Sequence, residues 1–218
     1  MSGKKFIFWG ASGQAIVLEE LLRRQGDELI CLFDNNENVH SPFEDLPLFY
    51  GKGGFETWLD DQQDIEISFA VAVGGEHGQQ RNQIHDYLEQ AGLKSSRLIH
   101  SRAFVADNAV IGDGCQILAH ATIGARVHVE KSVIVNSAAV VEHECVLNEG
   151  VHIGPGAVLG GLVHVRENSF VGLGARVLPR IQIGKNAVIG AGAVVTKDVA
   201  DNAVVVGIPA RPIPNPNA

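Results

Sequence analysis

The sequence predicts two parts, a small α/β domain over residues 1–98 and a parallel β-helix of six-residue repeats over residues 99–218. Strand-like and helix-like segments alternate in the first hundred residues. An aliphatic residue then recurs at every sixth position from Val105 to Val195. The chain also has 25 glycines but only 6% aromatic residues, which points to a repetitive fold with many tight corners.

The first domain opens with a strand, a glycine turn and a helix. KFIFW reads as the strand, GASGQA as the turn, and a group of apolar residues marks a helix that ends at Gly26. That group is Ile16, Val17, Leu18, Leu21 and Leu22. ELICLFDNN predicts a second strand, IEISFAVAVGG a third of the kind that parallel sheets bury, and EHGQQRNQIHDYLEQAGL another helix. This alternation is typical of a small Rossmann-like parallel sheet.

The second domain is defined by its six-residue period. A small residue lies two positions before many of the repeating aliphatic residues. The two side chains of such a pair point to the same side of an extended segment. The small residues are Ala103, Ala109, Cys115, Ala121, Ala139, Cys145, Ala157, Ser169, Ala175, Ala187 and Ala193. The pattern indicates short strands joined by tight corners, which is a β-helix. One long amphipathic helix would need a 3.6-residue period and would not tolerate so much glycine.

Composition excludes several functional classes. With 17 basic against 25 acidic side chains, a nucleic-acid binder that follows phosphates is not expected. The apolar runs are far too short to cross a membrane. Three widely spaced cysteines, an odd number, suit a reducing cytoplasmic compartment.

The glycine turn predicts an anion site. Gly10 and Gly13 flank Ser12 at the start of a helix, where free N–H groups and the positive end of the helix favour a phosphate. Asp34, at the end of the second strand, falls where such folds often meet a ribose or base. Because Ser12 and Ala15 replace two glycines of the dinucleotide fingerprint, a mononucleotide or nucleotide-sugar is a better candidate than NAD. A purely structural turn remains the alternative.

The stretch VVEHECVL places a histidine between two glutamates inside the repeat. The six-residue frame directs Val141 and Cys145 inward, so His143 and Glu144 are expected at an outward corner. A neighbouring carboxylate raises the basicity of an imidazole and favours a general base. Three repeats make a coil of 18 residues, so Gly161 should lie over His143 and leave room for an extended ligand.

A zinc site is the alternative interpretation of the histidines in the repeat. Some enzymes built on this architecture use two histidines 36 residues apart and a third five residues later. His128 and His164 have the first spacing, but Ser169 occupies the third position. Zinc catalysis needs three protein ligands, so no metal is expected.

The chain resembles the nucleotide-sugar and sialic-acid acetyltransferases. The best-described members of that family N-acetylate a UDP-4-amino-sugar in bacillosamine synthesis. The resemblance covers nearly the whole chain. It is carried by GASGQ, VAVGG, NSAAVVEHECVL, GVHIGPGAVLGG, FVGLGARVLP and VVVGIPARPI. It implies a left-handed β-helix with a C-terminal cap, acetyl-CoA as co-substrate, and a homotrimer whose acetyl-CoA groove lies between neighbouring β-helices.

The resemblance also implies roles for individual residues. His143 matches the catalytic base and Glu144 the residue that raises its basicity. His152, Leu173 and Ala191 match acetyl-CoA contacts, to which the stacking argument adds Gly161. The nucleotide-sugar contacts are Ser12, Gly13, Gln14, Asp34, Asn35 and Gly74. Gln14 and Asn35 depart from the family's usual residues, so the sugar and its nucleotide (UDP, dTDP, GDP or CMP) stay open, with UDP favoured.

The implied reaction is direct acetyl transfer from acetyl-CoA to the amine of a nucleotide-linked 4-amino-4,6-dideoxy sugar. Cys145 is interpreted as a packing residue and not as a nucleophile. Two alternatives stay open, O-acetylation of sialic acid or CMP-sialic acid and a trimeric scaffold without activity.

Overall fold

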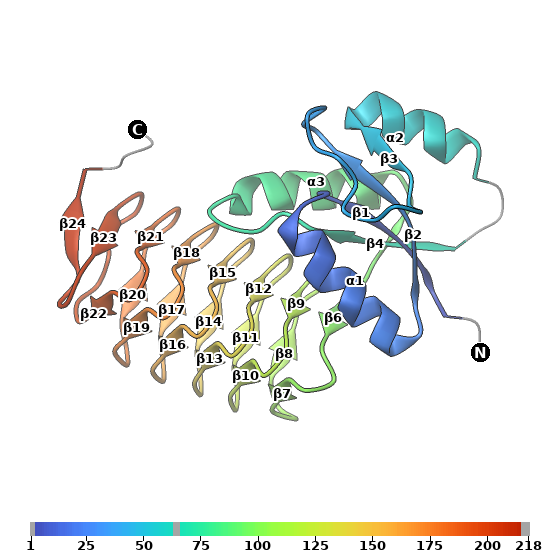
Figure 1. Cartoon of the computed structure of the whole chain (residues 1–218). Helices are drawn as coiled ribbons and strands as arrows, with labels where there is room; N and C mark the ends of the chain where they lie inside the picture. Colours follow the sequence, from blue (N-terminus) through green and yellow to red (C-terminus); the bar gives the residue numbers. More distant parts are fainter. Residues whose placement is uncertain (1–2, 63–65, 215–218) are drawn as a thin grey trace. The chain divides into compact units, whose positions relative to one another are not determined.

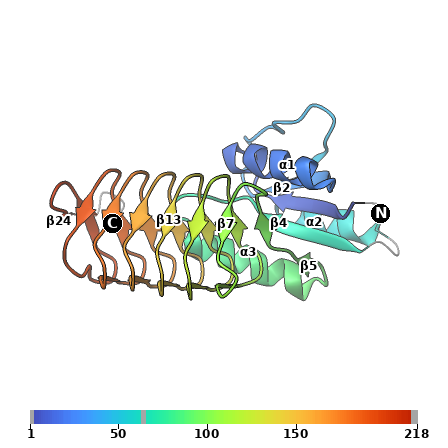
Figure 2. The ribbon, with the colours of Figure 1, turned by 90° about the horizontal axis from the view of Figure 1, so that it is seen from below.

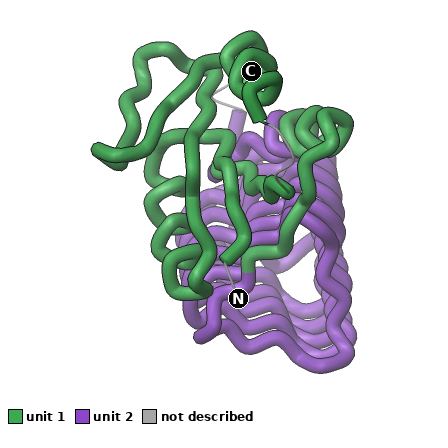
Figure 3. Tube along the Cα trace, turned by 90° about the vertical axis from the view of Figure 1, so that its right-hand side faces the viewer, with its two compact units in different colours: residues 1–73, 83–98 green, residues 74–82, 99–218 purple. Residues whose placement is uncertain are grey.

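A computed structural model describes residues 3–62 and 66–214. The chain divides into two compact units, coloured separately in Figure 3: residues 1–73 with 83–98, and residues 74–82 with 99–218. The sequence placed residues 74–82 in the first domain, whereas the structure makes them part of the second unit. The repeat pattern gave no sign of this exchange, because the segment lies outside the repeats.

The first unit is built on a parallel five-stranded sheet in the order β3-β2-β1-β4-β5 (Figure 1). The strands are β1 Lys5–Trp9, β2 Glu28–Asp34, β3 Leu48–Tyr50, β4 Ile67–Val71 and β5 Lys94–Ser95, and the helices are α1 Gly13–Gln25, α2 Gly51–Asp60 and α3 Gly78–Gln90. The predicted parallel α/β sheet is confirmed. The start of α3 belongs to the second unit and the rest of this helix to the first.

Two features of the first unit differ from the sequence-based expectation. Helix α2, with glycines at three of its first four positions, was not predicted, and burial of Phe55 and Trp58 explains how it overcomes poor helix propensity. In α1, Leu18, Leu21 and Leu22 are buried as expected. Ile16 and Val17 point outward and are 51% and 42% exposed.

The second unit is a left-handed parallel β-helix with three faces, as predicted. The first face contains β7 Phe104–Val105, β10 Thr122–Ile123, β13 Val140–Val141, β16 Val158–Leu159, β19 Arg176–Val177 and β22 Val194–Val195. The second contains β8 Val110–Ile111, β11 His128–Val129, β14 Val146–Leu147, β17 His164–Val165 and β20 Gln182–Ile183. The third contains β6 Leu98–Ile99, β9 Gln116–Ile117, β12 Ile134–Val135, β15 His152–Ile153, β18 Phe170–Val171, β21 Val188–Ile189 and β23 Val204–Val206, and β24 Arg211–Ile213 adds an antiparallel strand at its end.

Strands of successive coils pair in parallel with a register of 18 residues, as between Thr122 and Val140. Figure 2 shows these coils stacked along the β-helix. We call the turn at residues 142–145 and its equivalents the first corner, between the first and second faces. The second corner is 148–151 and the third is 154–157, each with its equivalents 18 residues apart.

Each corner contains one residue in the left-handed region of backbone space. From Gly114 to Gly192 every sixth residue has a positive φ, and Glu144 is one of the non-glycine members, with φ 58°. Such a conformation costs an L-residue about 1–2 kcal/mol. Many corners use glycine, and the hydrogen bonds between coils hold the others in place.

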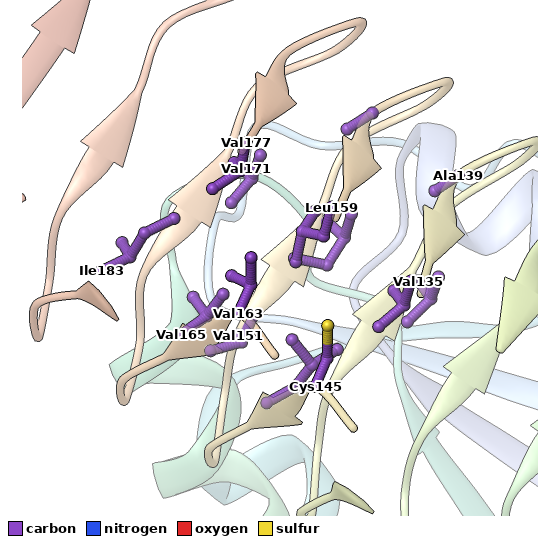
Figure 4. Close-up of a cluster of buried hydrophobic side chains, with 14 of the residues drawn as sticks. Val135, Ala139, Cys145, Val151, Leu159, Val163, Val165, Val171, Val177 and Ile183 are labelled. Carbon is purple, nitrogen blue, oxygen red and sulfur yellow. The ribbon is translucent and has the colours of Figure 1, made fainter. Parts of the chain in front are cut away.

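The interior of the β-helix consists of the repeating aliphatic residues and their small partners. Val141, Cys145 and Leu159 are completely buried, and Figure 4 shows Cys145 beside aliphatic side chains such as Val151 and Val163. Close packing on all three faces makes this part of the chain a rigid support for the side chains at its corners.

Candidate active site

His143 and Glu144 form an exposed pair at the first corner. The His143 side chain is 53% exposed, and its Nδ1 lies 3.1 Å from Oε2 of Glu144. Val141 and Cys145, which flank the pair, are fully buried. The predicted outward direction of His143 is therefore confirmed, and the alternation of inward and outward residues is its cause.

The contacts of this pair orient the imidazole. If Nδ1 carries the proton and donates it to the Glu144 carboxylate, Nε2 is left with a free lone pair. The other oxygen of Glu144, Oε1, is 3.8 Å from Nη1 of Arg126, one coil earlier, and Oε2 of Glu142 accepts a hydrogen bond from the His143 backbone N–H at 3.4 Å. An oriented imidazole at the surface is suited to act as a general base.

Gly161 lies beside the imidazole, one coil further along the first corner. A Cβ atom at this position would be 2.6 Å from Cε1 of His143 and closer still to Nε2. The backbone N–H of Leu162 donates to the His143 carbonyl at 2.9 Å, which fixes the two corners against each other. The stacking that the 18-residue coil predicted is confirmed. The imidazole edge lies directly over Gly161, and any side chain at this position would displace it.

Leu173 and Ala191 lie together on a different edge of the β-helix. Both occupy the third corner on neighbouring coils, and Leu173 is 59% exposed. His143 and Gly161 occupy the first corner. One chain therefore brings these residues together as two separate pairs, one on each edge, and does not unite them in one site.

His152 is almost completely buried in β15, with 5% of its surface exposed. Its Nδ1 lies 3.3 Å from the carbonyl oxygen of Gly75, its Nε2 lies 3.1 Å from Nδ2 of Asn136, and its ring packs edge-on against Phe170. Burial and, second, the positive charge of Arg81 lower the pKa of His152 to about 4, against an opposing contribution from the Gly75 carbonyl. His152 is thus neutral at pH 7, with protein partners on both ring nitrogens.

This buried imidazole predicts how stability depends on pH. In the unfolded chain His152 has its ordinary pKa of 6.5, so between about pH 6.5 and pH 4 the unfolded state takes up a proton that the folded state excludes. The free energy of unfolding should fall by up to about 3 kcal/mol as the pH drops through this window. Denaturant unfolding at a series of pH values measures it. The variant His152→Gln should show a shallower decline, and an equally steep one would contradict the assignment.

In the first unit, the glycine turn holds its residues at the start of α1. Ser12 is the N-cap residue with φ −130°, and both Ser12 and Gly13 are exposed. Gly10 has φ 111°, and a Cβ there would collide with the backbone of Ala72, so glycine is required at this position. Gln14 is half-buried in the first turn of the helix.

Asp34 braces this turn. Its Oδ2 accepts the backbone N–H of Ala11 and its Oδ1 that of Asn36, both at 2.9 Å. Asn35 next to it is exposed. The structure therefore gathers the predicted residues Ser12, Gly13 and Asp34 around one turn. Gly74 belongs to the second unit.

Sequence reasoning missed Arg81, Asn136 and Arg126, which contact or flank the predicted residues. Arg81 lies outside the motifs quoted above, and Arg126 reads as an ordinary exposed corner residue. Asn136 begins the motif NSAAVVEHECVL, but nothing in the sequence gave it a contact. Cys145 donates a hydrogen bond from Sγ to the Gly160 carbonyl at 3.2 Å, and burial raises the pKa of its thiol to about 11. That environment is unsuited to a nucleophile.

Within residues 3–62 and 66–214, no group of three or more His, Cys, Asp or Glu side chains is arranged to hold a metal ion. His164, from the rejected zinc spacing, pairs through Nε2 with Oδ1 of Asn148 at 2.6 Å. None of the helices in the same described part is both long and apolar enough to cross a bilayer.

Comparisons with known proteins show the family of this chain. The family described as bacterial transferase hexapeptide (six repeats) matches residues 163–197. The acetyltransferase domain of PglB from Neisseria gonorrhoeae FA1090, solved in complex with acetyl coenzyme A, is 31% identical. That match covers 97% of this chain and all of the other, with a TM-score of 0.85.

Two further solved structures are similar over almost their full length. A mutant of GDP-perosamine N-acetyl transferase from Caulobacter crescentus, in complex with CoA and GDP-perosamine, is 28% identical over 99% of both chains, with a TM-score of 0.88. WeeI from Acinetobacter baumannii AYE is 22% identical, covers 96% of this chain and all of its own, and has a TM-score of 0.79. At that identity WeeI supports the fold alone.

Proposed function

Because the chain belongs to the hexapeptide-repeat family of acetyltransferases, we propose that it transfers the acetyl group of acetyl-CoA to the amine of a nucleotide-linked 4-amino-4,6-dideoxy sugar. The observation that carries the proposal is the exposed His143–Glu144 pair, whose imidazole lies over Gly161 where no side chain intervenes. A trimeric scaffold without activity would have no need for an oriented imidazole next to a missing side chain.

In the proposed mechanism His143 is the general base. The sugar nitrogen attacks the thioester carbonyl carbon while Nε2 of His143 takes one of its protons, and Glu144 stabilises the imidazolium through Nδ1–H. Backbone N–H groups of the corners stabilise the oxyanion. The C–S bond then breaks, the new amide remains on the sugar, and the proton passes from His143 to the CoA thiolate. No covalent enzyme intermediate forms.

The first unit is proposed to hold the nucleotide-sugar. Ser12, Gly13 and Gln14 at the start of α1 offer backbone N–H groups and the positive helix end to the diphosphate. Asp34 and Asn35 are assigned to the nucleoside, and Gly74 completes the set. The C. crescentus relative is a GDP-perosamine enzyme. UDP stays our preferred carrier and GDP is the first alternative.

Acetyl-CoA is assigned to Gly161, Leu173, Ala191 and His152. Because both ring nitrogens of His152 have protein partners, its contact with the co-substrate would be made by ring carbons. Leu173 and Ala191 lie on the third corner and Gly161 on the first. A groove between two copies, with the first corner of one facing the third corner of its neighbour, brings the two pairs together. Three copies close such an arrangement into a ring.

The oligomer gives a simple expected result. Light scattering should report three times the mass of the 23.3 kDa chain. Association of the chains would cover apolar surface. Part of this surface is the exposed Leu173 on one edge of the β-helix, and another part is Leu178, 46% exposed, near another edge. A monomer that still binds acetyl-CoA would contradict the shared groove.

Acetyl transfer to a panel of nucleotide-linked amino sugars tests the function. The release of CoA thiol is followed with UDP-, dTDP-, GDP- and CMP-linked acceptors, and the products are identified by mass spectrometry. We expect one nucleotide to be preferred and the product to be an amide. Activity only on sialic acid or CMP-sialic acid would replace this proposal with O-acetylation, and no transfer to any acceptor would reject it.

A further inference from the structure

Arg81, in the first turn of α3, is completely buried in the second unit. Its Nε donates to the carbonyl oxygen of Ser132 at 2.8 Å, and its Nη2 donates to the carbonyl oxygens of Gly150 and Val151. Ser132 and Gly150 occupy the second corner on neighbouring coils, and both have positive φ. The guanidinium therefore ties two coils of the β-helix to the start of α3.

Burying this guanidinium opposes stability. Burial lowers its pKa to about 10, which still leaves the group charged at neutral pH. A buried cation is stable only when its donors meet well-placed acceptors. Arginine suits this place because its planar fork of donors reaches carbonyls on two coils at once, which the single ammonium of lysine does not do.

Residues 74–82 are here called the anchor segment. Besides Arg81, other residues of this segment contact the second corner of the β-helix. A Cβ at Gly78 would be 2.7 Å from Cα of Asn168 and still closer to the carbonyl of Gly150. Asn82 donates from Nδ2 to Oδ1 of Asn168 at 3.1 Å. Together with the Gly75–His152 contact, these interactions hold the segment along its length.

The anchor segment begins with Gly74, which the proposed function assigns to the nucleotide-sugar. It continues with Gly75, whose carbonyl is bonded to His152 and through it to Asn136. A neutral His152 has a single ring N–H, and the contact with Gly75 places it on Nδ1. The positive charge of Arg81 favours this neutral form.

We propose that Arg81 is a positioning residue for the acceptor substrate: it fixes the anchor segment on the β-helix, and thereby holds Gly74 and Gly75 in place for the nucleotide-sugar. The inference rests on the proposed function. Arg81 acts through the backbone that it anchors and does not touch the reacting atoms. The anchor segment contacts the second corner, whereas Gly161 lies at the first corner and Leu173 and Ala191 at the third. Of the residues assigned to acetyl-CoA, His152 contacts the anchor segment through Gly75.

The test compares the Michaelis constants of the two substrates. Arg81→Met keeps a long side chain but removes the donors, and Arg81→Lys keeps the charge. Ile183→Ala is the control, because this fully buried core residue contributes only to stability, at a cost of about 2–5 kcal/mol. Nucleotide and acetyl-CoA affinities are also measured by calorimetry, which does not require turnover.

We expect Arg81→Met to raise KM for the nucleotide-sugar at least about tenfold, since ordering even one or two backbone residues on binding costs that much. KM for acetyl-CoA should change less than KM for the nucleotide-sugar, because of the residues assigned to acetyl-CoA it is His152 that contacts the anchor segment. Arg81→Lys should recover part of the loss. Ile183→Ala should leave the ratio of the two KM values unchanged. Gly78→Ala pushes the anchor segment outward without removing a charge, and it should also raise KM for the nucleotide-sugar. This variant replaces Arg81→Met if Arg81→Met does not fold.

Equal changes in both KM values, or a shift in the Ile183→Ala control as large as in Arg81→Met, would overturn the positioning role and leave Arg81 as a structural residue. This failure is distinct from failure of the proposed function, in which the unmodified protein transfers acetyl to no nucleotide-linked amino sugar.

Discussion

Replacement of His143 by alanine lowers kcat for acetyl transfer by at least about a hundredfold, the usual contribution of a general base. The reason is positional. His143 is exposed at the first corner, its Nδ1 lies 3.1 Å from the Glu144 carboxylate, and its ring edge lies over Gly161. Without the imidazole, nothing at this position removes the proton from the attacking amine. Steady-state kinetics with saturating acetyl-CoA measure the loss.

The fold should survive this change, because His143 packs none of the interior. His128→Ala is the matched control, since His128 is also an exposed histidine of the β-helix but has no role in the proposed site. It should retain near-normal turnover. Glu144→Gln should give a smaller loss than His143→Ala, because the amide oxygen can still accept the Nδ1–H bond but carries no charge. A well-folded His143→Ala variant with normal turnover would remove His143 from the mechanism.

The second large effect concerns Gly161. The variant Gly161→Leu should lose both acetyl transfer and acetyl-CoA binding, because its Cβ would collide with Nε2 of His143 and the rest of the side chain would fill the space beside the imidazole. Gly161→Ala, which adds only the Cβ, should displace the imidazole and reduce kcat while acetyl-CoA still binds. Calorimetric titrations with acetyl-CoA and with the nucleotide-sugar separate these effects.

Nucleotide-sugar binding should persist in both Gly161 variants, because the glycine turn at Gly10 and Gly13 lies in the other unit. Gly112→Ala serves as the control. A Cβ at Gly112 would also be crowded, 2.7 Å from the backbone of Glu130, but far along the sequence from His143. It should cost stability and leave acetyl-CoA affinity unchanged. Unaltered acetyl-CoA affinity in Gly161→Leu would place the groove elsewhere.

The β-helix was predictable because the residues that fill its interior recur at a fixed spacing in the sequence. Each coil needs an inward aliphatic residue and a small partner, and these recur with a period that only short strands and corners satisfy. The same frame fixed which way His143 and Cys145 point and which residue lies over His143. Such conclusions follow from counting along the chain.

The rest depends on contacts that no local pattern records. The hydrogen bonds of Arg81 to Ser132 and Gly150 join residues more than fifty positions apart. Helix α2 forms despite the low helix propensity of its glycines, because Phe55 and Trp58 are buried in the core. His152 was identified by resemblance, but its burial and its bond to Gly75 are tertiary features.

The most direct test of the central claim uses two acceptors that differ in one group. Nucleotide-linked 6-deoxy sugars with an amine or a hydroxyl at C4 are incubated with the protein and acetyl-CoA, and the products are analysed by mass spectrometry and NMR. We predict an amide from the amino sugar, no transfer to the hydroxyl sugar, and stoichiometric release of CoA. An ester formed on the hydroxyl sugar, or no transfer to either acceptor with any nucleotide, would contradict the account.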